Sequence, residues 1–269
     1  MPSGKRAGAG PTSVVFLYGD RRANFATLSE PFVQACGGKD SKIALLMLPR
    51  SHRYESRYRE VWLEAGAGEV TAIYPPANLV LESGQLRTLR QSTGLFMPGG
   101  NTSLYQRVYG KKSVSRWIGE LHAAGIPYGG VSAGAMMAFG QVVVGGSTIR
   151  TRANEFQLVA DSNRASFKSE RPGLIVRKGL GLLRNGILEP HFAEWGRFPR
   201  MVEAMNLTGS RFGVGLDASI CLEIRDGRRG IVRGRGRLYL FRRETNGLGG
   251  RNFQVTWYEP GARFEFPTR

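Results

Sequence analysis

The stretch PYGGVSAGAMMAF, residues 127–139, joins an apolar strand to a helix through a Gly-x-Ser-x-Gly turn. Residues 127–133 form a short apolar run, and residues 135–139 look helical. The turn needs small residues, because a Cβ at the flanking positions would collide with the neighbouring backbone. We predict that Ser132 projects from this nucleophile elbow into a cleft, near the positive end of the following helix dipole.

Other short apolar runs precede this one, with helix-like segments between them, at residues 13–19, 42–50, 70–76 and 94–100. Strands that are buried on both faces of a parallel sheet have this nearly continuous apolar character. The alternation therefore predicts an α/β fold with a doubly wound, mostly parallel sheet covered by helices. Ligands of such sheets bind beyond the carboxyl ends of the strands.

The second half of the chain has a different pattern. Residues 141–175 are polar, and we expect an irregular excursion near the active site. Residues 186–192 predict a further strand and residues 194–206 a helix. From residue 213 onward, apolar or alternating runs separated by Gly, Asp and Asn turns predict antiparallel strands on the flank of the sheet.

Length and composition suit one sizeable α/β domain. We expect it to span residues 13–269, after a basic disordered tail at residues 1–12. No run approaches the roughly 20 apolar residues of a membrane span, so we expect a cytoplasmic protein without a membrane partner. Cys36 and Cys221 lack metal-ligand spacing and are interpreted as packed thiols.

The charge is strongly positive, with 38 Lys and Arg against 21 Asp and Glu, a net +17. Such a balance attracts polyanions. Residues 225–243 are the densest run, and the alternation of Arg233, Arg235 and Arg237 predicts that these three share one face of a strand. No zinc-finger spacing or aromatic RNA-binding signature accompanies the run. We interpret it as a solvated strand face and do not expect nucleic acid as a partner.

A second predicted strand end carries the sequence PGGNT, residues 98–102. The glycines let backbone N–H groups approach a substrate closely. We expect the N–H groups of Gly100 and Ala133 to form an oxyanion hole, and Asn101 to cap the helix that follows.

A serine hydroxyl needs a base to take its proton, and the chain has three histidines. His122 lies inside the helix before the elbow strand, and His52 begins a helix without a supporting pattern. His191 ends the apolar run 187–190, at a predicted strand end. Elimination and position therefore favour His191 as the base.

The third member of such a site is a carboxylate that orients the imidazole and stabilises its charged form. Glu155 is the first choice, Asp161 the second and Asp217 the third. Sequence spacing does not decide among them.

Five blocks of the chain resemble, in order, segments of the S51 serine peptidase family: LFMPGGNTSLY, GGVSAGAMM, STIRTRANE, GLGLL with EPHFAEWGRFPRM, and GVGLDASICLEI. The blocks run from about residue 94 to residue 224. This family contains aspartyl dipeptidases (peptidase E) and cyanophycinases. The resemblance implies a flavodoxin-like fold similar to class I glutamine amidotransferases, with serine where those enzymes carry cysteine.

The resemblance also implies roles for residues. Ser132 is the implied nucleophile, His191 the base and Glu155 the acid, with oxyanion contacts from Gly100 and Ala133. The block STIRTRANE resembles the dipeptidase segment that holds the triad aspartate, with glutamate substituted. Cyanophycinases also use glutamate in this role.

The blocks mix features of the two activities. Residues 189–192, Glu-Pro-His-Phe, are nearer the dipeptidase form than the Asp-Gln-His-Phe-like run of cyanophycinases. In contrast, Arg197 and Arg200 resemble the Arg-Gly-Arg helix start of cyanophycinases, with Trp195 in place of the first arginine. The 35 residues between Glu155 and His191 exceed what the short dipeptidases lead us to expect.

The expected activity is that of a serine-type exopeptidase or dipeptidase that cleaves a peptide or isopeptide bond next to an aspartyl unit. α-Aspartyl, β-aspartyl and cyanophycin-like substrates all remain candidates. We expect no metal and no organic cofactor, and a homodimer stays open. Arginine pairs well with a substrate carboxylate, and the candidate substrate contacts are Asn101, Glu189, Arg150, Arg152, Arg197 and Arg200.

Two alternative functions share parts of this pattern. An α/β-hydrolase esterase shares the elbow and the order Ser, acid, His, but its HGGG-type oxyanion segment is absent here. A non-catalytic protein on the same fold would use the basic strands to bind a polyanion.

Overall fold

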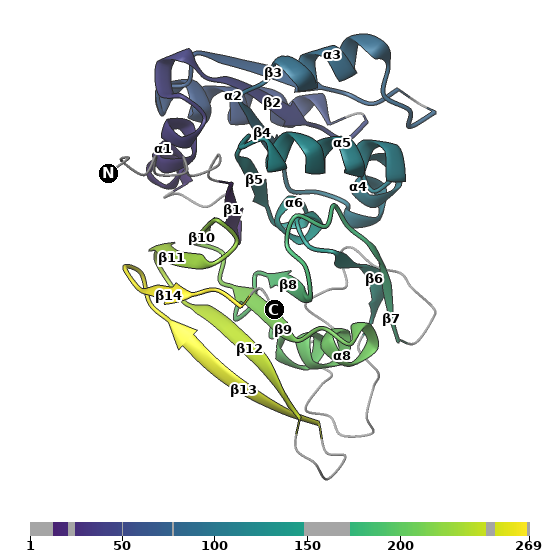
Figure 1. The fold of residues 1–269 in the computed structure, drawn as a ribbon, viewed down its shortest axis with the longest axis vertical. Coiled ribbons are helices and arrows are strands. Elements are labelled where there is room, and N and C mark those ends of the chain that lie inside the picture. The colour runs from purple at the N-terminus through teal and green to yellow at the C-terminus, as the bar shows by residue number, and fades with distance from the viewer. Residues whose placement is uncertain are drawn as a thin grey trace, which may run out of the picture.

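The computed structural model describes residues 13–20, 25–49, 51–76, 78–147, 173–245 and 251–267. Within these ranges the strands form an eight-stranded sheet, a four-stranded sheet and a two-stranded ribbon (Figure 1). No helix in the described ranges is both long enough and apolar enough to cross a membrane. The expected tail at residues 1–12 lies outside the described residues, and a single domain over residues 13–269 stays a prediction.

The parallel part of the large sheet confirms the predicted fold class. Its strands lie in the order β3 (Glu69–Ile73), β2 (Lys42–Leu46), β4 (Gly94–Met97), β5 (Tyr128–Val131) and β1 (Val14–Tyr18). Each overlaps one of the five apolar runs and ends before it does. All residues of β1, β4 and β5 are buried, as strands covered on both faces should be.

Helices cover both faces of this sheet and create two cores (Figure 1). On one face, α1 (Phe25–Ala35) and α2 (Glu55–Glu64) pack Phe32 and Trp62 against Phe96. The opposite face is covered by α3 (Ser83–Gln91), α4 (Thr102–Tyr109), α5 (Lys112–Ala123) and α6 (Ala133–Met137). Two short 3-10 helices, η1 (Gly38–Asp40) and η2 (His52–Tyr54), complete the loops on either side of β2.

Antiparallel strands continue the large sheet beyond β1, as predicted for the flank. They are β10 (Ile220–Arg225), β11 (Arg229–Gly234) and β14 (Arg263–Glu265). The other C-terminal strands pair antiparallel with one another, as predicted, but they do not lie on the flank of the large sheet. β9 (Phe212–Leu216), β12 (Leu238–Thr245) and β13 (Arg251–Tyr258) form the four-stranded sheet with β8 (Gly186–Pro190), which pairs parallel to β9. Alternation identifies a strand but does not select its partner.

The region predicted to be irregular contains regular structure at both ends. β6 (Gln141–Ser147) and β7 (Gly173–Lys178) form an antiparallel ribbon, and residues 142–146 are buried. Valine favours strands, and β6 contains three valines in a row. The prediction of an irregular segment was based on the polar residues that follow β6. Residues 148–172 lie outside the described residues.

The three alternating arginines do not share a strand face, so that prediction was wrong. Arg233 lies on β11, but the strand ends at Gly234. Gly234 and Gly236 have φ angles of 106° and 109°, a left-handed geometry that turns the chain before β12 begins.

Candidate active site

Ser132 lies between β5 and α6, at the carboxyl edge of the parallel strands. Its φ of 51° and ψ of −113° are strained for a residue with a Cβ. A Cβ on Gly130 would lie 2.5 Å from backbone atoms of Gly134, and one on Gly134 would lie 1.9 Å from the carbonyl oxygen of Met97. A side chain at either glycine would therefore clash with the backbone, as expected for a nucleophile elbow.

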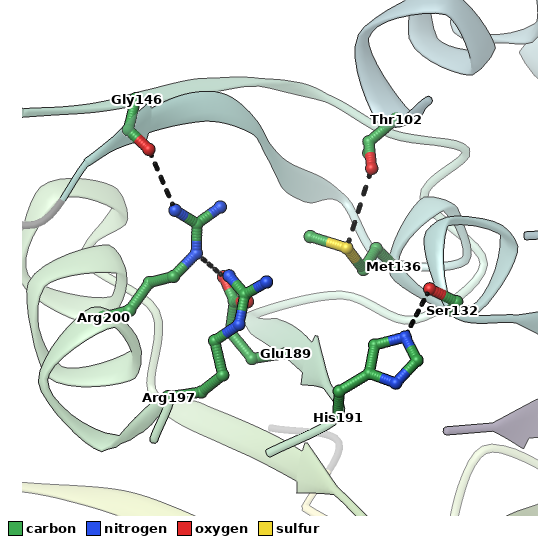
Figure 2. A network of polar contacts seen from close by, with 8 residues as sticks. All are labelled: Thr102, Ser132, Met136, Gly146, Glu189, His191, Arg197 and Arg200. Carbon is green, nitrogen blue, oxygen red and sulfur yellow. Dashed lines mark hydrogen bonds and ion pairs between the residues drawn. The ribbon is translucent and has the colours of Figure 1, made fainter. Parts of the chain in front are cut away.

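His191 follows β8 in the second sheet and faces the elbow. Its Nε2 atom lies 3.0 Å from the Oγ atom of Ser132 (Figure 2). The imidazole is buried, with 6% of the side chain exposed. His52 instead stacks on Tyr74 at 3.9 Å, and the Nδ1 atom of His122 lies 3.1 Å from the carbonyl oxygen of Ile126. The structure thus brings together the serine and the histidine that the sequence singled out.

The sequence did not predict the other contacts of His191. Trp195 stacks on the imidazole with ring centroids 4.0 Å apart, and the guanidinium of Arg197 lies 4.8 Å from the Trp195 ring. The Nδ1 atom of His191 lies 3.8 Å from Oδ2 of Asp20, which follows β1. The rule that strand ends carry site residues could have drawn attention to Asp20, but no motif marks it.

Two of the three acidic candidates lie outside the described residues. Glu155 and Asp161 are outside the described residues, as are Arg150 and Arg152. Asp217 accepts hydrogen bonds from the backbone N–H groups of Ala193 and Arg237, at 3.1 and 2.8 Å. Burial raises the pKa of Asp217. This carboxyl group therefore anchors the loop that follows His191.

The glycine loop after β4 lies beside the elbow. A Cβ on Gly99 would lie 3.4 Å from the Cβ of Ser132, and Gly100 has a φ of 154°. Ala133 is buried at the first position of α6. Both backbone segments that the predicted oxyanion hole requires thus adjoin Ser132. Asn101 caps α4, its Oδ1 atom accepting from the backbone N–H of Leu104 at 2.9 Å.

Glu189, Arg197 and Arg200 form a buried cluster behind His191 (Figure 2). Nη1 of Arg197 and Nε of Arg200 donate to the Glu189 carboxylate at 3.1 and 2.9 Å. Nη1 of Arg200 also donates to the carbonyl oxygen of Gly146 in β6 at 3.1 Å. Desolvation lowers the pKa of Arg197 to about 10, although the charge of Glu189 opposes that shift.

Glu189, Arg197 and Arg200 were all predicted from the sequence as substrate contacts. In the structure they bind one another. α8 (Phe198–Thr208) carries Arg200, and the turn before it carries Arg197. Both guanidiniums bind Glu189 in β8, two residues before His191. A contact between either arginine and substrate stays a prediction.

Neither cysteine enters the site. Cys36 and Cys221 are both buried, and burial raises the pKa of each thiol, in agreement with packed thiols. Within the described ranges, no group of three or more His, Cys, Asp and Glu side chains could hold a metal ion.

The fold and the site define an α/β protein with a nucleophile-elbow serine that faces a histidine across two sheets. A model of peptidase family S51 matches residues 49–232. The chain therefore belongs to peptidase family S51, which confirms the resemblance drawn from the five blocks.

Curated relatives of this chain include two cyanophycinases. The protein from Trichormus variabilis is 26% identical over 187 residues, which cover 67% of this chain and 57% of the relative. The protein from Geminocystis herdmanii is 25% identical over 205 residues, 71% of this chain and 65% of the relative. The matches thus span less than two thirds of the length of these relatives.

Solved structures support the fold. A peptidase from an acI-B1 Actinobacterium superposes with a TM-score of 0.62 at 16% identity, covering 96% of this chain and 98% of that one. A putative peptidase E from Listeria monocytogenes gives a TM-score of 0.54 at 17% identity, covering 84% of this chain and 100% of that one.

Proposed function

We propose that this protein is a serine peptidase that hydrolyses a peptide or isopeptide bond adjacent to an aspartyl residue. The observation that carries the proposal is the 3.0 Å approach of Ser132 Oγ to His191 Nε2, in a member of peptidase family S51. A hydroxyl in such contact with an imidazole can lose its proton as it attacks a carbonyl group.

The proposed reaction proceeds through an acyl-enzyme. Nε2 of His191 takes the Ser132 proton as Oγ bonds to the carbonyl carbon, and the N–H groups of Gly100 and Ala133 stabilise the oxyanion. The C–N bond then breaks, and the imidazolium gives its proton to the leaving amine. Water attacks the acyl-enzyme while His191 takes its proton, and the released Oγ recovers that proton. Glu155 is the acidic partner that the family resemblance implies.

Two observations support an aspartyl substrate. The curated relatives are cyanophycinases, and one structural neighbour is described as a putative peptidase E. The net charge of +17 also favours the approach of an acidic peptide. Because Arg197 and Arg200 are engaged with Glu189, Arg150 and Arg152 become the first candidates for a substrate carboxylate.

The test compares hydrolysis of Asp-Leu, isoAsp-Leu and β-Asp-Arg by the wild-type protein and by Ser132→Ala. We expect cleavage of at least one peptide, and a fall in kcat of about 10⁴-fold or more in the variant. Circular dichroism checks that both proteins are folded. If the folded wild type leaves all three peptides intact, the substrate class is wrong, and a fully active Ser132→Ala protein would rule out the mechanism.

The same panel includes p-nitrophenyl esters and a fluorophosphonate probe. Preferential cleavage of the esters would favour the esterase alternative. Labelling of wild-type protein but not of Ser132→Ala would identify Ser132 as reactive whichever substrate is correct.

A further inference from the structure

Asp20 lies at the same edge of the sheet as the elbow. β1 and β5 run parallel, and Tyr18 pairs with Val131, so the residues after the two strands emerge side by side. The backbone N–H of Ser132 donates to the carbonyl oxygen of Tyr18 at 2.9 Å, and that of Asp20 to the carbonyl oxygen of Ala218 at 2.9 Å. The backbone at Asp20 is therefore held between the elbow and the turn before β10.

The carboxylate of Asp20 faces the nitrogen of His191 that does not face Ser132. Oδ2 lies 3.8 Å from Nδ1, while Nε2 lies 3.0 Å from Ser132 Oγ. The first distance is that of an ion pair rather than of a hydrogen bond. Contacts of catalytic groups are often long without substrate and shorten in the complex. The order carboxylate, imidazole, hydroxyl is the one that serine catalysis requires.

Among the described residues, three other carboxylates near His191 bind other groups. Glu189 is bound by Arg197 and Arg200. Asp217 accepts the N–H of Ala193, and Oε1 of Glu194 accepts the N–H of Ala218 at 2.8 Å. Trp195 stacks on the face of the imidazole. The Asp20 side chain is 33% exposed, whereas that of His191 is 6% exposed.

We propose that Asp20 is a positioning residue for His191. It favours the tautomer with the proton on Nδ1, which leaves Nε2 free to accept the Ser132 proton. It then stabilises the imidazolium electrostatically. The catalytic consequence rests on the proposed function, whereas the electrostatic contact with His191 does not.

The first test is independent of any substrate. NMR titration follows the His191 ring protons in wild type, Asp20→Asn and Asp20→Glu, with His52→Gln and His122→Gln to assign the signals. A nearby carboxylate stabilises the charged imidazole, so Asp20→Asn should lower the pKa of His191 by about 0.5 to 1 unit. Asp20→Glu should recover most of the loss.

Asp40→Asn is the matched control, because Asp40 is exposed in η1, before the amino end of β2, and carries the same charge. It should leave the His191 pKa unchanged. An Asp20→Asn protein that is folded and titrates like wild type at His191 would overturn the proposal.

The second test measures fluorophosphonate labelling of Ser132 and peptide hydrolysis across pH, for Asp20→Asn and Glu155→Gln in parallel. Asp20→Asn should slow both reactions by at least about tenfold and move the acid limb of the pH profile downward. If only Glu155→Gln changes the rates and the His191 pKa, the assignment to Asp20 is wrong. If the NMR effect is present but wild-type protein neither labels nor hydrolyses, the contact stands and the proposed function fails.

Discussion

Two regions of this molecule contain the same arrangement, a fully buried glutamate bound by two arginines. The first is the cluster of Glu189, Arg197 and Arg200 behind His191, in which the arginine side chains are 6% and 8% exposed. The arginines come from the turn and helix after β8, and one of them also ties β6 to the cluster. Almost none of this cluster is exposed to bulk water.

The second region is the flank of the large sheet. There Glu223 in β10 accepts from Arg225 and Arg233, the latter with its Nε atom 2.8 Å away. These arginine side chains are 42% and 34% exposed. Each can turn toward solvent with little change in the backbone.

The comparison shows that the same ion pairs can differ in their contribution to stability, because that contribution depends on how far the arginines are buried. Removing one partner of a buried pair leaves an uncompensated charge, whereas an exposed partner is rehydrated. The cluster behind His191 therefore fixes the position of a site residue, and the flank cluster joins β10 to β11.

The largest expected effect is that of Glu189→Gln. This change leaves two buried guanidiniums with one neutral partner, and it should lower the free energy of unfolding by about 3–5 kcal/mol. Because His191 lies two residues further on, activity should also fall. Urea denaturation and hydrolysis of the best peptide measure the two effects. A loss of only about 1 kcal/mol or less would show that the cluster behaves like the flank.

Glu223→Gln is the matched substitution on the flank and should have a smaller effect. The half-exposed arginines can be hydrated, so we expect a loss of about 1 kcal/mol of unfolding free energy. Peptide hydrolysis should be unchanged, since no described contact links Glu223 to Ser132 or His191. Equal losses for Glu189→Gln and Glu223→Gln in the same urea experiment would remove the distinction between the two clusters.

The smallest effect is expected at the rim of the flank, where five arginines line a groove between β10, β11 and β14. Arg228 and Arg229 are about 70% exposed and lie near Glu265 and Asp226. Replacing both by Ala should change the unfolding free energy by less than about 1 kcal/mol. A gel shift with single-stranded DNA at several salt concentrations tests the polyanion alternative. Tight, salt-sensitive binding that this double variant loses would contradict our interpretation of a solvated face.

Some features of the structure could be predicted from local sequence patterns. The elbow at Ser132 depends on glycines within two residues and on an apolar strand before it, and the five parallel strands depend on short apolar runs. The glycines of the elbow lie close to Ser132 in the sequence, and the strands require only apolar residues in a short run. Both features can therefore be recognised from the sequence. The positions of Ser132 and His191 at strand ends followed from the same reasoning.

Other features depend on partners that are distant in the chain. The pattern from residue 213 onward predicted strands, but it did not divide them between two sheets. The sequence also placed Arg197 and Arg200 near the site, yet it did not show that their guanidiniums point to Glu189. Asp20 was missed because a single aspartate after a strand has no distinguishing context until His191 is brought beside it.

The amino-acid sequence by itself determined the parallel core and the two residues at the centre of the candidate site, because glycine sterics and apolar burial act over a few residues. The family followed from the resemblance of the five blocks to peptidase family S51. Only the tertiary structure decided which charges face one another. Coulombic and hydrogen-bonding partners are selected by spatial proximity, and here that proximity is created where the second sheet packs its β8 end against the elbow of the first.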